Sequence, residues 1–407
     1  MNILLITAYF PPDTGSAANL FFELGGELVR KGHLVTVLTS FPSYHVTGET
    51  THYKGKKFSE EQINGIKIFR VKVPQFPRYI PATRALWQFT MAYCFSNSIK
   101  KLKEHDIALI YSPPLPLGFT GAFLKKKIGT PFILNVQDLF PQSAIDLKIL
   151  KNRLLICFFQ YLERNIYNFV DHITVHSPGN RNRVVKTGID PKKVTIVPNW
   201  IDTNFVNAGE KPNPFSKEHG LLNKFVVSFA GVIGYSQDID IVLNAAHLLR
   251  EEKDILFLIV GDGVEKGRLM KKAQDMGLDN VTFLPMQPRS IYPFVLHTSD
   301  VCLVTLNKEV LSPVVPSKIL SIMAAEKPLI ACMNLEGDAP KVIKDAKCGF
   351  VFPAGEHKGL AQAALKLYNS SKLREEYGLN GRTYCVKNFS LDTCADRYIR
   401  LFEQVLN

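Results

Sequence analysis

The chain has 407 residues, of which 46% are hydrophobic and 21% are charged. This length predicts two or three domains, and the composition excludes disordered, collagen-like and coiled-coil proteins. The seven cysteines form no CxxC pair and no cluster with histidine. The sequence therefore indicates neither a disulfide framework nor a zinc site, and we expect reduced thiols in a cytoplasmic protein. We expect no secretory signal and no membrane-spanning segment, because the apolar runs are too short.

The net charge of +12 lies entirely in the first half of the chain. Residues 1–200 carry 25 Lys and Arg against 13 Asp and Glu, whereas residues 201–407 carry 24 of each. This asymmetry favours an anionic partner for the first half: nucleic acid, anionic lipid or a phosphorylated substrate. A purely solubilising surface is the alternative that composition leaves open.

Short apolar runs alternate with helical patterns along the whole chain, which predicts parallel sheets covered by helices on both faces. The first series of predicted strands covers residues 2–8, 34–39, 66–71, 107–112, 132–136, 173–176 and 194–198. A segment rich in Pro, Gly and charge at 209–220 is typical of a linker. A second series covers 225–231, 255–261, 281–285, 301–306, 328–332 and 349–352, and an amphipathic helix at 390–407 closes the chain. The fold class is therefore α/β with two doubly wound domains, and ligands are expected at the carboxyl ends of the strands.

Glycines follow several predicted strands and allow a backbone to approach a phosphate closely. Gly15 follows the first strand, Gly231 and Gly234 follow the first strand of the second half, and Gly261 precedes Asp262 after the next strand. Each is also compatible with an ordinary turn. The absence of GxGxxG and of a P-loop weakens the nicotinamide-enzyme and NTPase hypotheses.

The segment VVPSKILSIMAAEKPLIA (314–331) is the most informative one. Pro316 and Ser317 are typical of a helix start, with Ser317 as the expected N-cap. Lys318 then lies in the first turn, where a cation opposes the helix dipole unless an anion binds there. Backbone N–H groups and this ammonium would form a diphosphate site, and a solvated, functionless lysine is the alternative.

Two polar residues of the first half follow predicted strands. Asp138 stands at the end of one strand, where it would face a ligand or cap the next helix. His176 ends another strand and is equally compatible with a structural role. Residues 78–103 combine aromatic bulk with basic flanks, so this helix would lie either on an anionic bilayer or in the core.

Taken in order, the segments resemble glycosyltransferase family 4 with the GT-B fold, over essentially the whole chain. The sequence is most similar to the bacterial branch that builds O-antigen, capsule and colanic acid, including N-acetyl-L-fucosaminyl transferases. The residues that carry the resemblance are the opening YFPPDTGSAANLFFELGGELVRKGHLVTVLTSFPSY and the motifs VQDLFP, HSPGN, IVPNWID, GDG, NVTFLP and VPSKILSIMAAEKP.

The resemblance implies two Rossmann-like domains facing across a cleft: an acceptor domain at 1–205, onto which helix 390–407 packs back, and a donor domain at 221–389. It implies retaining transfer from a nucleotide sugar, with uracil as the base, without metal or other cofactor. The acceptor would be a saccharide on a polyprenyl diphosphate at the inner leaflet, so the protein would be peripheral to the cell membrane.

The resemblance also implies roles for particular residues. Gly15 would approach the donor phosphates or sugar, and the loop at Met286 would hold the base. Ser317 and Lys318 would hold the diphosphate. Asp138 would reach the reacting sugar or the acceptor hydroxyl, and we assign no protein base firmly.

The sequence departs from the family pattern at several positions. The family's two Glu, which have seven residues between them, are replaced by Pro313 and by Ser321. We place Ser321 among the donor-binding residues. The family's Gly after the helix is Glu326. An Arg and a Lys usually found after the first strand of the donor domain are absent from residues 231–240, so Lys318 becomes the expected diphosphate cation, assisted by Arg268.

Three alternatives remain open at this stage. A UDP-sugar 2-epimerase shares the GT-B architecture and would act without an acceptor. A non-catalytic assembly partner of the same fold would transfer no sugar. Nucleic-acid binding lacks any helix-turn-helix, zinc-finger or aromatic RNP pattern to accompany the charge, and we expect none.

Overall fold

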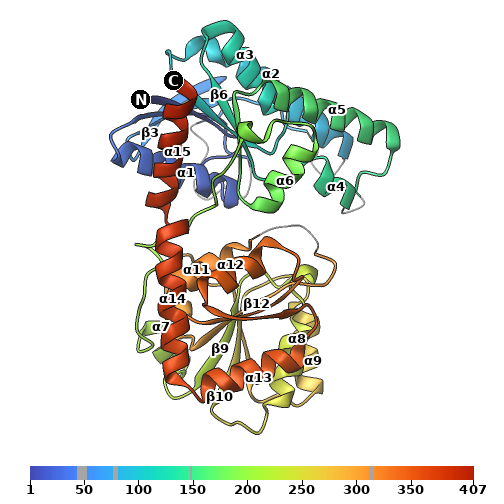
Figure 1. Ribbon diagram of the computed structural model, residues 1–407, viewed down its shortest axis with the longest axis vertical. Coiled ribbons are helices and arrows are strands. Elements are labelled where there is room, and N and C mark those ends of the chain that lie inside the picture. Colours follow the sequence, from blue (N-terminus) through green and yellow to red (C-terminus); the bar gives the residue numbers. More distant parts are fainter. Residues whose placement is uncertain (44–52, 77–80, 147–148, 311–314) are drawn as a thin grey trace. The chain divides into compact units, whose positions relative to one another are not determined.

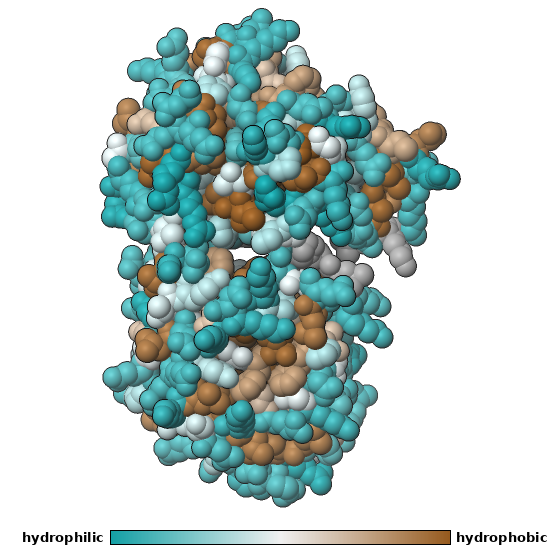
Figure 2. Space-filling model, viewed as in Figure 1, coloured by the Kyte–Doolittle hydropathy of each residue, from teal (hydrophilic) through white to brown (hydrophobic). Residues whose placement is uncertain are grey.

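The computed structural model describes residues 1–43, 53–76, 81–146, 149–310 and 315–407. The chain divides into two compact units, the first made of Met1–Asn199 with Leu391–Asn407 and the second of Trp200–Ser390. Each unit has a central sheet with helices on both faces (Figure 1). Hydrophilic side chains cover most of the visible surface, with hydrophobic patches among them (Figure 2).

The sheet of the first unit has the strand order β3-β4-β2-β1-β5-β6-β7-β8 within the described residues. All neighbouring strands are parallel except β3 and β4. The strands are β1 (Asn2–Ile6), β2 (Leu34–Ser40), β3 (Phe58–Ile63), β4 (Ile66–Val71), β5 (Ile107–Ser112), β6 (Phe132–Val136), β7 (His172–Val175) and β8 (Val194–Ile196). The helices are α1 (Ser16–Arg30), α2 (Pro81–Ser98), α3 (Leu117–Ile128), α4 (Gln142–Asp146), α5 (Arg153–Phe169), α6 (Pro178–Lys186) and α15 (Leu391–Leu406).

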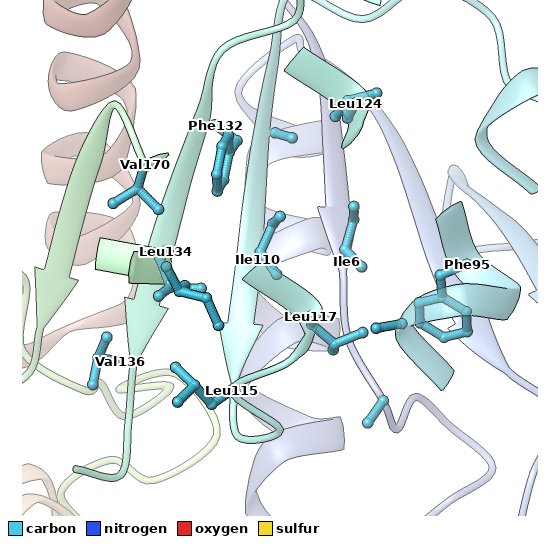
Figure 3. Packing of buried hydrophobic residues seen from close by; sticks show 14 of the residues in the cluster. Ile6, Phe95, Ile110, Leu115, Leu117, Leu124, Phe132, Leu134, Val136 and Val170 are labelled. Atoms are coloured by element: carbon cyan, nitrogen blue, oxygen red, sulfur yellow. The ribbon is translucent and has the colours of Figure 1, made fainter. Parts of the chain in front are cut away.

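The core of the first unit lies between the central strands and the helices that cover them. Every residue of β5 and β6 is buried, as expected for strands covered on both faces. Figure 3 shows side chains of β5 and β6, Ile110 and Leu134 among them, packed beside Leu117 of α3 and Phe95 of α2. Each such fully buried side chain contributes about 1.5–3 kcal/mol.

The aromatic helix of the first unit belongs to this core. Trp87, Met91 and Phe95 of α2 are buried, and α2 packs against α3. Residues 78–80 lie outside the described residues. The core interpretation of this segment is therefore the one that the structure supports.

The closing helix α15 packs on the first unit beside α1. Lys31, the C-cap of α1, forms ion pairs of 2.7 Å with both Asp392 and Asp396 of α15. On the buried side, Asn135 of β6 donates a 2.8 Å hydrogen bond to the hydroxyl of Tyr398. The end of the chain is thus fixed to the middle of the first sheet.

The sheet of the second unit is parallel throughout its described strands, with the order β11-β10-β9-β12-β13-β14. These strands are β9 (Phe225–Ala230), β10 (Ile255–Val260), β11 (Val281–Leu284), β12 (Val301–Thr305), β13 (Leu329–Met333) and β14 (Gly349–Pro353). The helices are α7 (Pro214–Glu218), α8 (Asp240–Leu248), α9 (Lys266–Asp275), α10 (Tyr292–Thr298), α11 (Ser317–Ala324), α12 (Asp338–Ala346), α13 (His357–Tyr368) and α14 (Ser371–Phe389). Among the described residues, short 3₁₀ turns are η2 (Ile99–Lys101) and η3 (Pro191–Lys193) in the first unit and η4 (Tyr235–Gln237) in the second.

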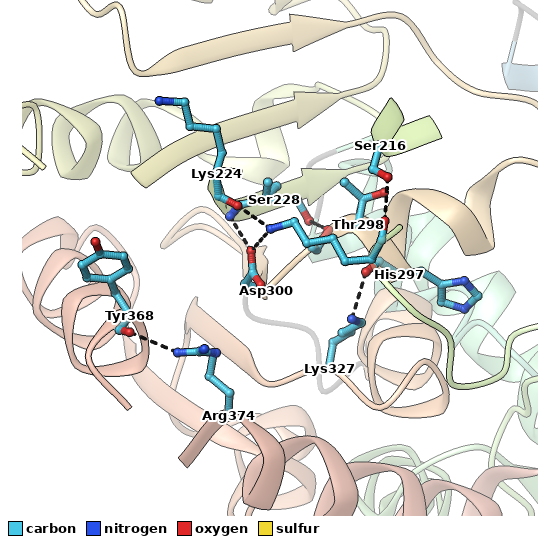
Figure 4. Close-up of polar contacts among 12 residues, drawn as sticks. Ser216, Lys224, Ser228, His297, Thr298, Asp300, Lys327, Tyr368 and Arg374 are labelled. Carbon is cyan, nitrogen blue, oxygen red and sulfur yellow. Dashed lines mark hydrogen bonds and ion pairs between the residues drawn. The ribbon is translucent and has the colours of Figure 1, made fainter. Parts of the chain in front are cut away.

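The predicted linker at 209–220 is wrong as a description of this segment, because it contains α7 and packs into the second unit. Asn213 and Ser216 form a capping box at the start of α7, and Phe215 is buried. Lys211 forms a 2.5 Å ion pair with Asp300, part of the polar cluster drawn in Figure 4. Pro214 starts a helix here and Lys211 forms an ion pair within the second unit. A composition rich in Pro and charge therefore did not indicate a linker.

Glu326 replaces the glycine that the family pattern leads us to expect after α11. Its φ of 59° lies in the left-handed region, and its N–H donates to the carbonyl of Met323 at 3.1 Å. This is the C′ position of a helix, where glycine is preferred because a Cβ is unfavourable there.

We expect Glu326→Gly to unfold at a higher temperature than Glu326→Ala, by a stability difference of about 1 kcal/mol. Both variants lose the same carboxylate, and only alanine keeps the Cβ that strains the left-handed backbone. Thermal unfolding of the two variants measures the difference. Equal melting temperatures would show that the position carries no backbone strain.

Candidate active site

In the second unit, the loops after β9 and β10 are joined through their backbones at the carboxyl edge of the sheet. The N–H of Gly231 donates to Val260 at 2.8 Å, and the N–H of Ile233 donates to the carbonyl of Asp262 at 2.9 Å. A Cβ on Gly261 would collide with the carbonyl of Gly231. Glycine is therefore required where the two loops touch, and polypeptide backbone lines this edge.

Lys318 of α11 reaches the same edge. Its Nζ lies 3.7 Å from the centre of the Phe229 ring and 3.3 Å from Oε1 of Gln237. A Cβ on Gly231 would stand 2.5 Å from Cε of Lys318, so the lysine stem lies directly against the glycine. Neither Phe229 nor Gln237 was singled out in the sequence, although both flank the glycine loop.

The electrostatics around Lys318 are those of an anion site. Burial lowers the pKa of Lys318 from 10.5 to about 7. Among the described residues, no carboxylate forms an ion pair with it. A cation that is desolvated without an anionic partner is unfavourable, and a bound phosphate would provide the missing charge.

The start of α11 adds to this field. The helix begins at Ser317, its N-cap is Pro316, and no side chain caps it. The expectation that Ser317 is the N-cap is therefore wrong: proline takes that position, and the exposed Ser317 is the first helical residue. An uncapped helix N-terminus with no acid in its first turn favours an anion beside it. Pro313 lies outside the described residues.

Asp262 positions the loop that follows β11. Its carboxylate accepts a 2.7 Å hydrogen bond from the N–H of Met286 and forms a 2.7 Å ion pair with Lys266. The side chain of Met286 is exposed. Asp262 thus acts on the Met286 loop through the backbone, which leaves the loop surface free to meet a ligand.

Arg268 and Ser321 lie in other surroundings than Lys318. Arg268 forms 2.6 Å ion pairs with Asp240 and with Glu265, and its hydrogen bonds help to lower the pKa of Asp240 to about 2. To contact a diphosphate it would have to exchange one of these carboxylates. Ser321 is buried, and its hydroxyl donates to the carbonyl of Ser317 at 3.3 Å. Gly234 lies in the loop before η4 with ordinary negative φ.

In the first unit, Gly15 stands at the start of α1 beyond the end of β1. It is the N-cap of that helix, with φ of 137°, and no side chain caps the helix. The residue is exposed, so its backbone is open to solvent. This is the geometry in which a phosphate or a sugar hydroxyl can approach a backbone.

Asp138 follows β6 at the same edge of the first sheet. It is solvent-exposed, yet the protein atoms around it raise the pKa of its carboxyl by desolvation. Burial raises the pKa of Tyr111 at the end of β5, and the charge of Asp138 raises it further. Helix α4 begins only at Gln142, so Asp138 does not cap it.

The residues beside Asp138 hold its backbone in place. Gln137 donates a 2.9 Å hydrogen bond to the side chain of Asn199 and accepts one of 2.8 Å in return. Gln137 also donates to Asn135 at 2.9 Å. These contacts could not be predicted from the sequence, although Gln137 and Asn199 belong to the motifs VQDLFP and IVPNWID. His176, beyond β7, lies 3.2 Å from the amide of Asn180.

Within the described residues, no group of three or more His, Cys, Asp and Glu side chains is placed to hold a metal ion. No helix of these residues is long and apolar enough to cross a membrane.

Comparison with known families matches both halves of the chain. Residues 17–205 match the model described as Glycosyltransferase Family 4, and residues 213–384 match the model described as Glycosyl transferases group 1. Together these matches cover Asp138, Gly231, Gly261 and Lys318, whereas Gly15 lies just before the first matched range.

Individual proteins of similar sequence also bear glycosyltransferase names. One of them is WcaI of Escherichia coli K12, whose name assigns it to colanic acid biosynthesis as a glycosyl transferase. The two sequences are 26% identical over 332 residues, which are 80% of this chain and 81% of that protein. The chain is also 26% identical to the O-antigen chain mannosyltransferase C of Escherichia coli, and this match covers 100% of this chain and 99% of that protein.

Solved structures show the same fold at low identity. HepE of Anabaena, solved in complex with UDP, superposes with a TM-score of 0.72 at 16% identity, covering 99% of this chain and 100% of that one. WaaG, a glycosyltransferase involved in lipopolysaccharide biosynthesis, superposes with a TM-score of 0.66 at 15% sequence identity. The match covers 98% of this chain and 99% of that one. The GT-B fold expected from the sequence is confirmed, and no name among these relatives supports the epimerase alternative. The first half of the chain therefore matches Glycosyltransferase Family 4, the second half matches the group 1 glycosyl transferases, and the protein is a glycosyltransferase enzyme.

Proposed function

We propose that the protein is a retaining, metal-independent glycosyltransferase of surface polysaccharide biosynthesis that uses a UDP-sugar, with UDP-N-acetyl-fucosamine as the first donor to test. The observation that carries the proposal is Lys318, a desolvated lysine with no carboxylate partner among the described residues, beside an uncapped helix start. The O-antigen and colanic acid names of the relatives support the pathway, and the UDP bound to HepE supports the nucleotide.

The donor would bind to the second unit. Its diphosphate would lie between Lys318, the first turn of α11 and the backbone at Gly231, and its base would lie on the Met286 loop that Asp262 holds. Negative charge grows on the leaving diphosphate in the transition state. Fixed N–H groups and one ammonium stabilise that charge more strongly in a desolvated site than in water.

The first unit would bind the acceptor and the sugar. Gly15 offers an exposed backbone at the start of a helix that no side chain caps, and Asp138 presents a carboxyl whose pKa desolvation raises. In retaining transfer, the leaving phosphate itself can take the acceptor's proton, so Asp138 would orient the sugar or the acceptor hydroxyl.

The acceptor would be a saccharide carried on a polyprenyl diphosphate at the inner face of the cell membrane. The net charge of +12 in residues 1–200 supports this proposal, because a basic surface favours both an anionic leaflet and a lipid diphosphate.

A transfer assay tests the proposed function directly. Purified protein is incubated with a series of UDP-sugars and a polyprenyl-diphosphate-linked saccharide, with and without EDTA, and the product's anomeric configuration is determined by NMR. We expect transfer with retained configuration that EDTA leaves unchanged. An inverted product, or transfer that requires a divalent cation, would overturn the proposed mechanism.

A further inference from the structure

Helix α5 of the first unit exposes an apolar stripe that none of the unit's described residues covers. Leu154, Phe158 and Tyr161 are exposed by 82%, 49% and 69%. Their spacing of four and three residues places them above one another on one face of the helix. Leu155 and Phe169, exposed by 49% and 53%, extend the apolar surface at the two ends. Hydrophobic side chains gather over this end of the unit in Figure 2, where Figure 1 places α5.

The opposite face of α5 explains why the helix itself is stable. Leu162, Ile166 and Tyr167 are buried against the first unit, and α5 packs on α3. The helix is capped by Asn152, whose side chain accepts from the N–H groups of Leu154 and Leu155. The apolar stripe is therefore a second hydrophobic face of a helix that is already fully docked, over about 25 Å of length.

The charges beside the stripe are basic. Arg153 and Arg164 lie about three turns apart on the same edge of α5, both exposed, and Lys151 precedes the helix. Among the described residues, none of these three forms an ion pair with a carboxylate. The acidic side chain of α5, Glu163, is buried on the other face, where burial raises its pKa to about 7. The exposed face thus combines apolar residues with cations.

We infer that this stripe, defined as Leu154, Phe158 and Tyr161 with the flanking Arg153 and Arg164, is a docking surface for an anionic lipid bilayer. Apolar side chains beside a basic edge match the acyl boundary and the negative headgroups of such a surface. A second copy of this chain fits less well, because a symmetric contact through the stripe would bring like charges together. The inference rests on the proposed function only for the choice of membrane.

Sedimentation with lipid vesicles tests the inference on the full chain. We expect the wild type to bind phosphatidylcholine vesicles that contain phosphatidylglycerol more strongly than vesicles without it. The triple variant Leu154→Ser, Phe158→Ser and Tyr161→Ser should bind at least about tenfold more weakly, because it loses apolar area that enters the interface. The variant Arg153→Gln and Arg164→Gln should also lose about tenfold, and only on anionic vesicles.

A matched control replaces exposed leucines of the second unit. Leu248 and Leu379 are exposed by 50% and 58%, so Leu248→Ser with Leu379→Ser removes exposed apolar side chains away from the stripe. This variant should bind vesicles as the wild type does. All variants should melt as the wild type does, because the replaced side chains are exposed.

Three outcomes would overturn the inference: no vesicle binding by the wild type, equal binding by the triple variant, or a wild-type dimer in light scattering that the triple variant loses. None of these measurements needs donor or acceptor. A failed transfer assay with intact vesicle binding would therefore reject the proposed substrates and leave the docking surface standing.

Discussion

Replacement of Lys318 by methionine will lower kcat/KM for the UDP-sugar by at least about 100-fold, the size of effect seen when one fixed donor to a developing anion is removed. Methionine keeps the length and apolar stem beside Gly231 and Phe229 while removing the ammonium. The free protein should melt at a higher temperature, since a desolvated cation is replaced by an apolar group. Steady-state kinetics and thermal unfolding measure the two effects.

Lys327 provides a matched control for this variant. It too is a largely buried lysine of the second unit, burial lowers its pKa, and it donates to the carbonyl of His297 at 2.9 Å (Figure 4). Lys327→Met should therefore alter stability without the loss of kcat/KM. Similar kinetic losses in both variants would show that lysine burial in general, rather than the position of Lys318, matters for activity.

The same lysine makes donor affinity depend on pH. The folded, unliganded protein binds the Lys318 proton with a pKa of about 7, below 10.5 for the unfolded chain. Because the unfolded state then binds more protons between about pH 7 and 10.5, the contribution of Lys318 to stability rises with pH in this window. A diphosphate restores the charge and takes up a proton, so UDP affinity should fall as pH rises above 7.

Calorimetric titration of UDP between pH 7 and 9 measures this dependence. The terminal phosphate of UDP has already lost its second proton in this range, because the pKa of that ionisation is about 6. The decrease should therefore vanish in Lys318→Met. A pH-independent affinity in the wild type would contradict proton uptake by Lys318.

Gly231→Ala should cost about 2–3 kcal/mol of stability and strongly weaken donor binding. The residue has φ of 141°, which side chains rarely adopt, and the new Cβ would stand 2.5 Å from Cε of Lys318. The side chain of Lys318 would therefore have to move away from residue 231. Chemical denaturation and UDP titration measure the two losses.

Gly234→Ala is the control for stability at the neighbouring glycine. Gly234 has φ of −118°, and a Cβ there would meet Val232 at 3.9 Å, an ordinary contact. Its substitution should change stability by less than about 0.5 kcal/mol. If Gly231→Ala were equally mild, the packing of Lys318 against Gly231 would not be a constraint.

The parallel strands of both units could be predicted from the sequence because each is a short, continuous apolar run. The antiparallel strand β3 was missed, since its residues alternate between exposed and partly buried and include Glu60 and Glu61. A signal was present all the same. Asn64 and Gly65 join β3 to β4 with positive φ values of 51° and 79°, as expected for a two-residue hairpin.

The site could be predicted only in part. Lys318 and the glycines stood out because a cation in a first helical turn and a glycine after a strand are locally unusual. The contacts of Lys318 with Phe229 and Gln237 join segments about 80 residues apart in the chain, and sequence patterns do not show such pairs. Arg268 could not be judged either, because its partner Asp240 lies on another helix.

Binding of nucleoside diphosphates to the purified protein in EDTA tests the central claim most directly. Titration calorimetry compares UDP, GDP and ADP on the wild type and on Lys318→Met. A metal-independent UDP-sugar site predicts UDP binding that EDTA does not change and that Lys318→Met weakens. Failure of all three nucleotides to bind the wild type, or UDP binding that needs a divalent cation, would contradict the donor site at Lys318.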